Sequence, residues 1–179
     1  MSPDYQIITR EFVLRLVDAE ESEALQQLVV RSPSLHQWVE WCHADFSLNE
    51  ADRFILATRL NWVKSDAYGF GIFRRSDDVL VGMVAINELY QTFNMASLGY
   101  WLADEFQHQG YARKALLALC EFCFDILKLT RLEIVCDPDN LASQKLATAC
   151  GAKFETLAAN RFIFNGKPKQ GAVYSIVPK

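Results

Sequence analysis

A loop between an apolar strand and a long amphipathic helix has the residues best suited to bind an anion. The segment reads LGYWLADEFQHQGYARKALLALCEF, and Gly110 and Ala112 stand where its helix begins. The first turn of a helix has unpaired backbone N–H groups and a partial positive charge, so a pyrophosphate can dock there if no side chain blocks it. The candidate binding residues are Gln107, His108, Gln109, Gly110, Tyr111, Ala112 and Arg113. The alternative is a loop whose small residues only ease helix–sheet packing.

The spacing Gln107-x-x-Gly110-x-Ala112 is the pyrophosphate-binding signature of the GCN5-related N-acetyltransferases (GNAT), and the segment resembles that motif from its strand into its helix. The later stretch VCDPDNLASQKLATACGAKFE resembles the following motif of the family, so the resemblance covers the chain nearly end to end. The string GYWL and the N-x-x-S spacing are most similar to the ribosomal-protein branch. The resemblance implies one N-acetyltransferase domain over residues 1–179, with acetyl-CoA as donor and a primary amine as acceptor.

Acetyl transfer from a thioester sets three tasks for the site. The amine must lose a proton, charge develops on the carbonyl oxygen, and the departing thiolate must be protonated. The resemblance places the carbonyl against a backbone N–H of the GYWL strand, which makes Leu102 the expected oxyanion donor. Ser143, one turn after a helix cap at Asn140, is expected to protonate the sulfur, and Asn140 to contact the pantetheine arm or the acetyl group. Ser143 as an ordinary residue of the helix's first turn, and Asn140 as an ordinary cap, are the alternatives.

The general base is less evident from the sequence. Glu88 ends a strand and is expected to reach the cleft directly or through a water, although a solvated glutamate at a strand end is the commoner finding. Relatives of the ribosomal branch often have a glutamate shortly before the Asn-Gly hairpin, where this chain reads Arg161-Phe162-Ile163-Phe164. This departure casts doubt on importing their base or their substrate.

Periodicity predicts an α/β (α+β) fold that agrees with the resemblance. A strand at Phe12–Leu16 precedes two or three helices within residues 19–65, the first signals being Asp18 with Glu21 and Ser47 with Glu50. Three short β-rich runs then predict an antiparallel meander up to Leu102, followed by a helix over 112–126, the strand RLEIVC, a short helix, and two strands around an Asn-Gly turn. The GNAT fold implied is a central mixed, mostly antiparallel sheet flanked by helices and splayed in the middle to hold acetyl-CoA.

Composition limits the partners and the location. The formal net charge of −4 and the pI near 5.4 argue against a direct nucleic-acid binder. The first residues lack a secretory signal, and no apolar run approaches the ~20 residues of a membrane span, so a cytoplasmic location without membrane contact is expected. No zinc-ligand spacing joins the histidines to the cysteines.

The five cysteines form an odd, scattered set, which predicts free thiols in a reducing compartment. Cys120 and Cys123 lie on one apolar helix face, where packing is commoner than redox chemistry. Cys136 ends the strand beside the expected thiol site, where oxidation would allow a mixed disulfide with coenzyme A.

The acceptor stays open at this stage. Trp38, Trp41 and Phe46, with Glu40 and Asp45, either wall an acceptor site or belong to the core. Candidate acceptors are a protein N-terminal α-amine or a small amine such as a polyamine, an amino acid or an aminoglycoside. A coenzyme-A-binding module without turnover is the alternative class, although it would have no evident need for a serine beside Asn140. The resemblance implies a possible homodimer, because members of the family often pair, with Phe162 and Phe164 near the terminal hairpin as the apolar contact.

Overall fold

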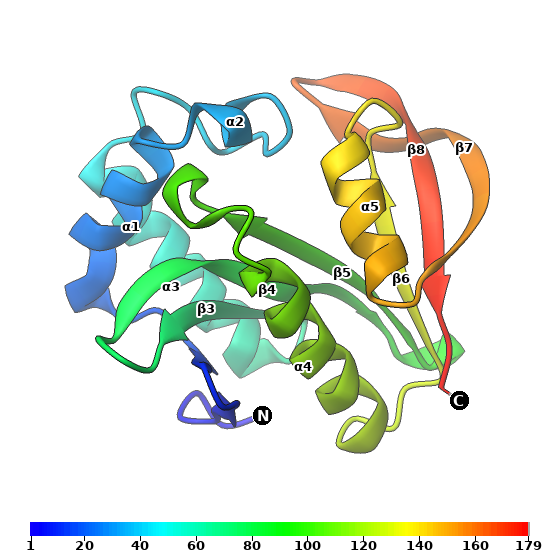
Figure 1. Ribbon diagram of the computed structural model, residues 1–179, viewed down its shortest axis with the longest axis horizontal. Helices are drawn as coiled ribbons and strands as arrows, with labels where there is room; N and C mark the ends of the chain where they lie inside the picture. Colours follow the sequence, from blue (N-terminus) through cyan, green and yellow to red (C-terminus); the bar gives the residue numbers. More distant parts are fainter. Residues whose placement is uncertain (179) are drawn as a thin grey trace.

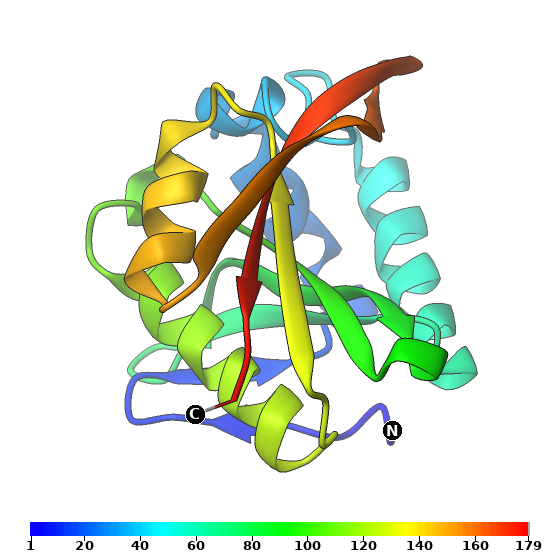
Figure 2. The ribbon, with the colours of Figure 1, turned by 90° about the vertical axis from the view of Figure 1, so that its right-hand side faces the viewer.

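A computed structural model describes residues 1–178. Its helices cover both faces of one sheet (Figures 1 and 2). The helices are α1 (Ser22–Val30), α2 (Pro33–His36), α3 (Leu48–Lys64), α4 (Tyr111–Asp125) and α5 (Leu141–Ala149), with 3₁₀ turns η1 (Ala19–Glu21), η2 (Gln91–Phe93) and η3 (Asp104–Phe106). The strands are β1 (Ile7–Ile8), β2 (Phe12–Arg15), β3 (Tyr68–Arg74), β4 (Val79–Tyr90), β5 (Met95–Leu102), β6 (Arg131–Cys136), β7 (Lys153–Phe164) and β8 (Lys167–Ile176).

The sheet has the order β1-β2-β3-β4-β5-β6-β8-β7. Every neighbouring pair is antiparallel except β5 with β6, which is parallel. This mixed, mostly antiparallel sheet between helices confirms the fold class and the element order expected from the sequence. The two-residue strand β1, which extends the sheet at its edge, was not expected.

Two apolar cores hold the helices on opposite faces of the sheet. The larger core joins α4 to strand residues such as Leu98 and Ile134, and the smaller core joins α1 and α3 to residues such as Met83 and Trp101. Figure 2 shows α4 and α5 on one side of the sheet and α3 on the other. The two faces of the central strands therefore meet different partners, which matters for the site.

Local signals fix where the helices begin. The predicted capping box of α3 is present, because Ser47 Oγ accepts from Glu50 N at 3.3 Å and Glu50 Oε2 accepts from Ser47 N at 2.8 Å. Before α1, Glu21 Oε2 accepts from Asp18 N at 2.7 Å.

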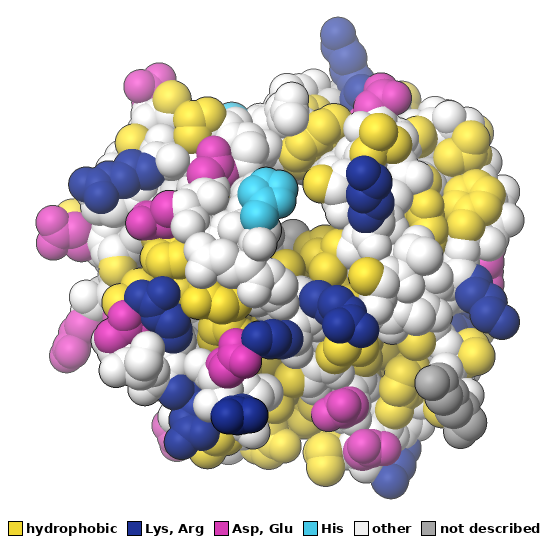
Figure 3. Space-filling view, viewed as in Figure 1, with side chains coloured by type: hydrophobic (Ala, Val, Ile, Leu, Met, Phe, Trp, Pro, Cys, Tyr) yellow, Lys and Arg dark blue, Asp and Glu magenta, His cyan; other side chains and the backbone are white. Residues whose placement is uncertain are grey.

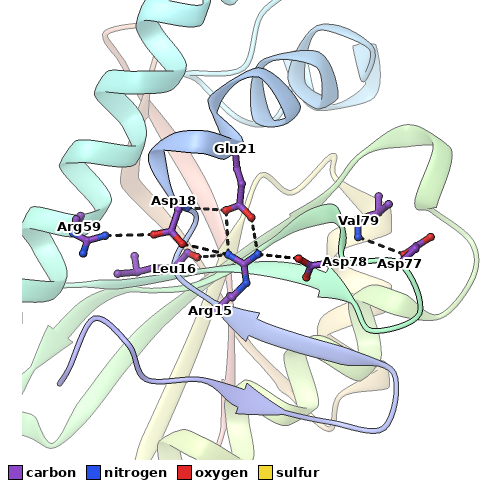
Figure 4. A network of polar contacts seen from close by, with 8 residues as sticks. All are labelled: Arg15, Leu16, Asp18, Glu21, Arg59, Asp77, Asp78 and Val79. Carbon is purple, nitrogen blue, oxygen red and sulfur yellow. Dashed lines mark hydrogen bonds and ion pairs between the residues drawn. The ribbon is translucent and has the colours of Figure 1, made fainter.

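Arg15 ties the helical layer to the edge of the sheet, as Figure 4 shows. Its Nη2 lies 2.6 Å from Glu21 Oε1 and 3.5 Å from Asp78 Oδ2 in the β3–β4 turn. Asp18 in turn accepts from Arg59 of α3 at 3.4 Å. The guanidinium also lies 3.5 Å from the centroid of the Phe73 ring, so this charged group is packed as well as paired.

Candidate active site

The sheet opens between its two parallel strands. β5 pairs with β6 only from Met95↔Arg131 to Leu98↔Ile134. Beyond that point β5 continues to Leu102 against β4, and β6 continues to Cys136 against β8. Figure 3 shows the result as an opening through the molecule between the side of α5 and the side of α4. The splay expected from the sequence is present, and its closed end lies at Leu98.

Backbone groups of β5 face this gap. Ala103 N donates to Val81 O at 3.1 Å, so Leu102 and its opposite residue Gly82 form a pair that exchanges no hydrogen bonds. In an antiparallel ladder such a residue directs its N–H and C=O away from the partner strand, and the pattern also holds two residues earlier, at Tyr100. The N–H groups of Tyr100 and Leu102 thus face the gap, where β6 no longer pairs with β5. The Leu102 N–H thus has the direction that its expected role requires, and Tyr100 is a second candidate donor that the sequence analysis did not single out.

The N-terminus of α4 lies beside the gap and is open to an anion. Gly110 is the residue before the helix, with φ +75, and no side chain caps the first turn. A Cβ built on Gly110 would meet nothing within 4 Å, so the space above it is free. Since the first helical bond runs from Lys114 N to Gly110 O, the N–H groups of Tyr111, Ala112 and Arg113 have no carbonyl of the helix to bind. These groups, with exposed His108 and Gln109 before them, form the expected cradle.

Some predicted cofactor residues use their side chains for bracing. Gln107 Nε2 donates to Ser34 Oγ at 3.1 Å and to Leu102 O at 3.1 Å, which ties the loop to α2 and to the end of β5. Arg113 Nε donates to Ala149 O at 3.0 Å, at the end of α5. The Tyr111 ring packs edge-on against Phe12, with centroids 5.0 Å apart. Tyr111 and Arg113 therefore offer an anion their backbone N–H groups rather than their side chains, whereas the N–H of Gln107 already donates to Asp104 O at 3.3 Å.

Asp104 completes this brace. Its carboxylate accepts from the hydroxyl of Ser34 and, at 3.2 Å, from Ser34 N, while Asp104 N donates to Ser32 Oγ at 3.0 Å. α2 is thereby fixed to the segment that leads from β5 into α4. No sequence motif marks these contacts, because they join residues about 70 positions apart.

The first turn of α5 points Ser143 at the gap. Asn140 Oδ1 accepts from Ser143 N at 3.1 Å, so Asn140 caps the helix as the simpler interpretation required. The Ser143 hydroxyl lies 2.9 Å from the hydroxyl of Tyr100, which also donates to Ser143 O at 3.0 Å. Burial raises the pKa of Tyr100. Burial also raises the pKa of the Cys136 thiol, partly offset by a hydrogen bond with Ser143. Ser143 therefore spans the two sides of the gap.

Glu88 lies away from these donors. A register shift between Ile86 and Glu88 pairs Glu88 with Ser97, three residues before Tyr100 and five before Leu102. At about 3.4 Å per residue the separations along β5 are about 10 Å and about 17 Å. The hydroxyl of Tyr90 hydrogen-bonds the Glu88 carboxylate. This register favours a route through water over a direct reach of Glu88 into the reaction centre, and the role of Glu88 as base stays a prediction.

Two of the aromatic residues before α3, Trp41 and Phe46, pack in the smaller core rather than form a free wall. Phe46 is 3% exposed, and Trp41 stacks on Phe54 with centroids 4.2 Å apart. The ring of Trp41 also packs edge-on against that of Trp101 of β5, with centroids 5.8 Å apart, so Trp41 packs against the strand that forms one side of the gap. Trp38 is half-buried and Asp45 exposed.

Glu40 has a different role in the structure. Its Oε1 accepts from Asn165 N at 2.7 Å, at the tip of the β7–β8 hairpin. The hairpin extends beyond Cys136, the last residue of β6, and α2 is fixed just beyond the end of β5. The contact therefore bridges the two sides at the open end of the splay. With this contact the gap between β5 and β6 is enclosed on all sides and forms a passage through the molecule.

The cysteines of the chain are buried free thiols. Cys120 and Cys123 pack in the larger core, as the simpler interpretation of their spacing required. Within residues 1–178 no three His, Cys, Asp or Glu side chains gather as a metal site. No helix in this range is both long and apolar enough to cross a membrane.

Comparisons with known proteins agree with this geometry. The acetyltransferase (GNAT) domain family matches residues 11–153. A Vibrio cholerae protein provisionally described as a ribosomal-protein-serine acetyltransferase is 60% identical, with a TM-score of 0.93 over 99% of this chain and 100% of its own. The ribosomal-protein-serine acetyltransferase of Escherichia coli K12 is 26% identical over 145 residues, 80% of each chain. A ribosomal L7/L12 α-N-protein acetyltransferase is 25% identical, with a TM-score of 0.86 over 97% of this chain and 98% of its own, and holds coenzyme A in a disulfide with one of its cysteines.

Proposed function

Because the chain belongs to the GNAT family of acetyltransferases, we propose that it acetylates the N-terminal α-amine of a protein, a ribosomal protein in the first place. The chain is an N-acetyltransferase that uses acetyl-CoA. The single observation that carries the proposal is the gap between β5 and β6, where backbone N–H donors of one strand face the Ser143 hydroxyl. What remains to be assigned is the duty of each residue and the kind of amine.

The coenzyme has a defined path through the site. Its pyrophosphate fits the open N-terminus of α4, and its arm then runs into the gap past Leu102 toward Tyr100. Leu102 is closer along the chain to the phosphate cradle, whereas Tyr100 lies next to the closed end at Leu98. The thioester is at the far end of the pantetheine arm. We therefore assign the Tyr100 N–H to the carbonyl oxygen, and the Leu102 N–H to an amide of the arm.

The Ser143 hydroxyl can supply the proton that the sulfur needs. In the reaction an N–C bond forms, the C–S bond breaks, and the leaving thiolate takes up a proton while the amine loses one. When the Tyr100 hydroxyl donates its one proton to Ser143 Oγ, the Ser143 hydroxyl is left free to direct its own proton elsewhere. Its place across the gap from the Tyr100 backbone sets it beside the sulfur when the carbonyl is bound. Burial of Tyr100 keeps that phenol protonated, so it serves as a fixed partner of Ser143.

The acceptor side favours the end of a flexible chain. The bridge from Glu40 to Asn165 closes the passage into a ring, which a peptide terminus can enter and a side chain on a folded surface enters less readily. Glu88, the carboxylate expected as the base, lies about 10 Å along β5 from Tyr100. An α-amine, with pKa near 7.7–8.0, needs less help than a lysine near 10.4. The names of the relatives point the same way.

An acceptor panel tests the proposal. The purified chain would be offered acetyl-CoA with a synthetic peptide that begins with serine, spermidine, a free amino acid and an aminoglycoside, and kcat/KM would be compared. The matched control is the same peptide with a blocked N-terminus and an internal lysine. We expect the free N-terminus to be preferred at least tenfold and the blocked peptide to be inert. Preferred acetylation of spermidine or another small amine would overturn the protein acceptor and leave the acetyltransferase assignment intact.

Assembly stays a prediction. Phe162 and Phe164, the residues expected to support a homodimer, are both half-buried. Sedimentation of the purified chain would decide the oligomeric state.

A further inference from the structure

A β-bulge places one residue of β4 outside the regular ladder. Ile86 pairs with Leu98 and Glu88 with Ser97, so Asn87 is the extra residue between them. Bulges of this kind occur beside active sites, where they turn a side chain in a new direction. Here the bulge lies next to the last pair of β5 with β6, which is Leu98 with Ile134.

The Asn87 side chain lies against the backbone at the closed end of the gap. A Cβ built on Gly99 would stand 2.4 Å from Asn87 Nδ2 and 3.1 Å from its Oδ1. Gly99 is the first residue of β5 beyond the pairing with β6. Its lack of a side chain gives the amide of Asn87 its place, because no real Cβ tolerates such contacts.

This amide lies on the face opposite to the coenzyme. Leu98 and Tyr100 pack with the core that includes α4. Because side chains alternate along a strand, Gly99 and Trp101 face the other side of the sheet. Trp101 accordingly joins the core of α1 and α3. The phosphate cradle and Ser143 belong to α4 and α5. The coenzyme therefore fills the gap from one face, and an acceptor has to arrive from the face where Asn87 lies.

Asn87 is also available for a ligand. The residue is exposed, and its side chain makes no hydrogen bond within residues 1–178. An amide oxygen accepts a hydrogen bond without charge, so it can hold a neutral amine with its lone pair free. A carboxylate at this place would instead favour the protonated amine, which cannot attack.

We propose that Asn87 is an acceptor-binding residue whose side-chain oxygen accepts an N–H of the attacking amine at the closed end of the β5–β6 gap. The inference rests on the proposed function only in requiring an amine acceptor. It deepens that function by naming the group that aims the amine. Gly99 has a positioning role, since its bare backbone leaves room for the amide.

The first experiment compares Asn87→Ala with Asn61→Ala, an equal change at an exposed asparagine on α3. Both are assayed with acetyl-CoA and with whichever amine of the panel the wild type acetylates. For Asn87→Ala we expect kcat/KM for the amine to fall about tenfold to hundredfold, as for loss of one hydrogen bond to a polar ligand, with KM for acetyl-CoA within about twofold of wild type. Asn61→Ala should match wild type. An unchanged kcat/KM for the amine in folded Asn87→Ala would overturn the inference.

Two further variants separate binding from mere packing. Asn87→Asp should lower kcat without raising KM for the amine, because the new carboxylate would bind the amine in its protonated form, which cannot attack. Gly99→Ala should resemble Asn87→Ala, whereas adding Gly99→Ala to Asn87→Ala should cost less than about threefold more, since the displaced group is already gone. Full additivity of the two losses would contradict the contact. If the wild type does not acetylate peptides, the proposal of a protein acceptor fails but the role of Asn87 is still tested, because the variants are assayed with whichever amine the wild type acetylates.

Discussion

Replacement of Gly110 separates the effect of charge from that of strain at the phosphate cradle. Gly110→Gln and Gly110→Glu have nearly the same size and force the same backbone conformation, φ +75, on a residue with a side chain. They differ in one negative charge. Because a Cβ at this position meets nothing within 4 Å, neither variant clashes with the protein itself. Any difference in coenzyme affinity therefore reports on an anion bound at the N-terminus of α4.

The expected magnitudes follow from simple electrostatics. A left-handed conformation costs a non-glycine residue about 1–2 kcal/mol of folding stability, in either variant. Two unit charges 4 Å apart repel by about 1 kcal/mol in water and about 4 kcal/mol at a protein surface. Gly110 is exposed, so about 2 kcal/mol for each of two phosphate charges is a fair value. Gly110→Glu should then bind acetyl-CoA about 10³-fold more weakly than Gly110→Gln.

Calorimetric titration with acetyl-CoA, at low and at high salt, provides the measurement. The gap between the two variants should narrow in high salt, because exposed charges are screened. Gly166→Gln is the strain control, since Gly166 has φ +70 and open space in the β7–β8 turn, away from the cradle. It should lose stability and retain coenzyme affinity. Equal affinities of Gly110→Gln and Gly110→Glu, in folded protein, would refute an anion site here.

Other substitutions test the remaining duties. Ser143→Ala should leave coenzyme affinity nearly unchanged and lower kcat about 10²-fold in steady-state assays, while equal losses in binding and rate would make Ser143 only part of the helix cap. Glu88→Gln should lose at most about tenfold, because the register of β4 favours a route through water, and the loss should be greatest at low pH, where the amine is protonated. Parallel pH–rate profiles would remove Glu88 from the mechanism. On oxidation Cys136 should form a disulfide with coenzyme A. The reaction should be faster at higher pH, because burial raises the pKa of the Cys136 thiol and only the thiolate reacts. In mass spectrometry Cys136→Ser should gain no coenzyme mass.

The sequence predicted the elements whose signals are local. The box of Ser47 with Glu50 marks the start of α3, and it forms as expected because both partners lie within one turn. Gly110 likewise marks the start of α4, since a residue with φ +75 in open space is a position for glycine. Such features depend on neighbours along the chain, so a single sequence contains them.

Features that depend on pairing between distant strands were not predictable in this way. The bulge at Asn87 needs the register of β4 against β5, which no periodicity of either strand reveals. The same register moved Glu88 away from the reacting groups and gave the Tyr100 N–H its direction. The motif identified Gln107 as part of the site, but it did not predict that the Gln107 side chain donates to Ser34. A motif gives the position of a residue along the chain and not the contacts of its side chain.

Arg161 shows how these long-range contacts bear on the acceptor. A second irregularity, between Ala158 and Phe162 of β7, accompanies a contact from Arg161 Nη2 to Glu133 Oε2 at 3.2 Å, and Arg131 holds the other oxygen of Glu133 at 2.8 Å. Arg161, which stands just before the Asn-Gly hairpin, thus adds no base and also neutralises a neighbouring carboxylate. An amine acetylated here has to reach its neutral form with little help. At neutral pH an α-amine is about 300-fold richer in that form than a lysine side chain, given pKa values near 7.7–8.0 and 10.4. The charge pairing on this face is therefore an argument for a chain terminus as acceptor, independent of the names of the relatives.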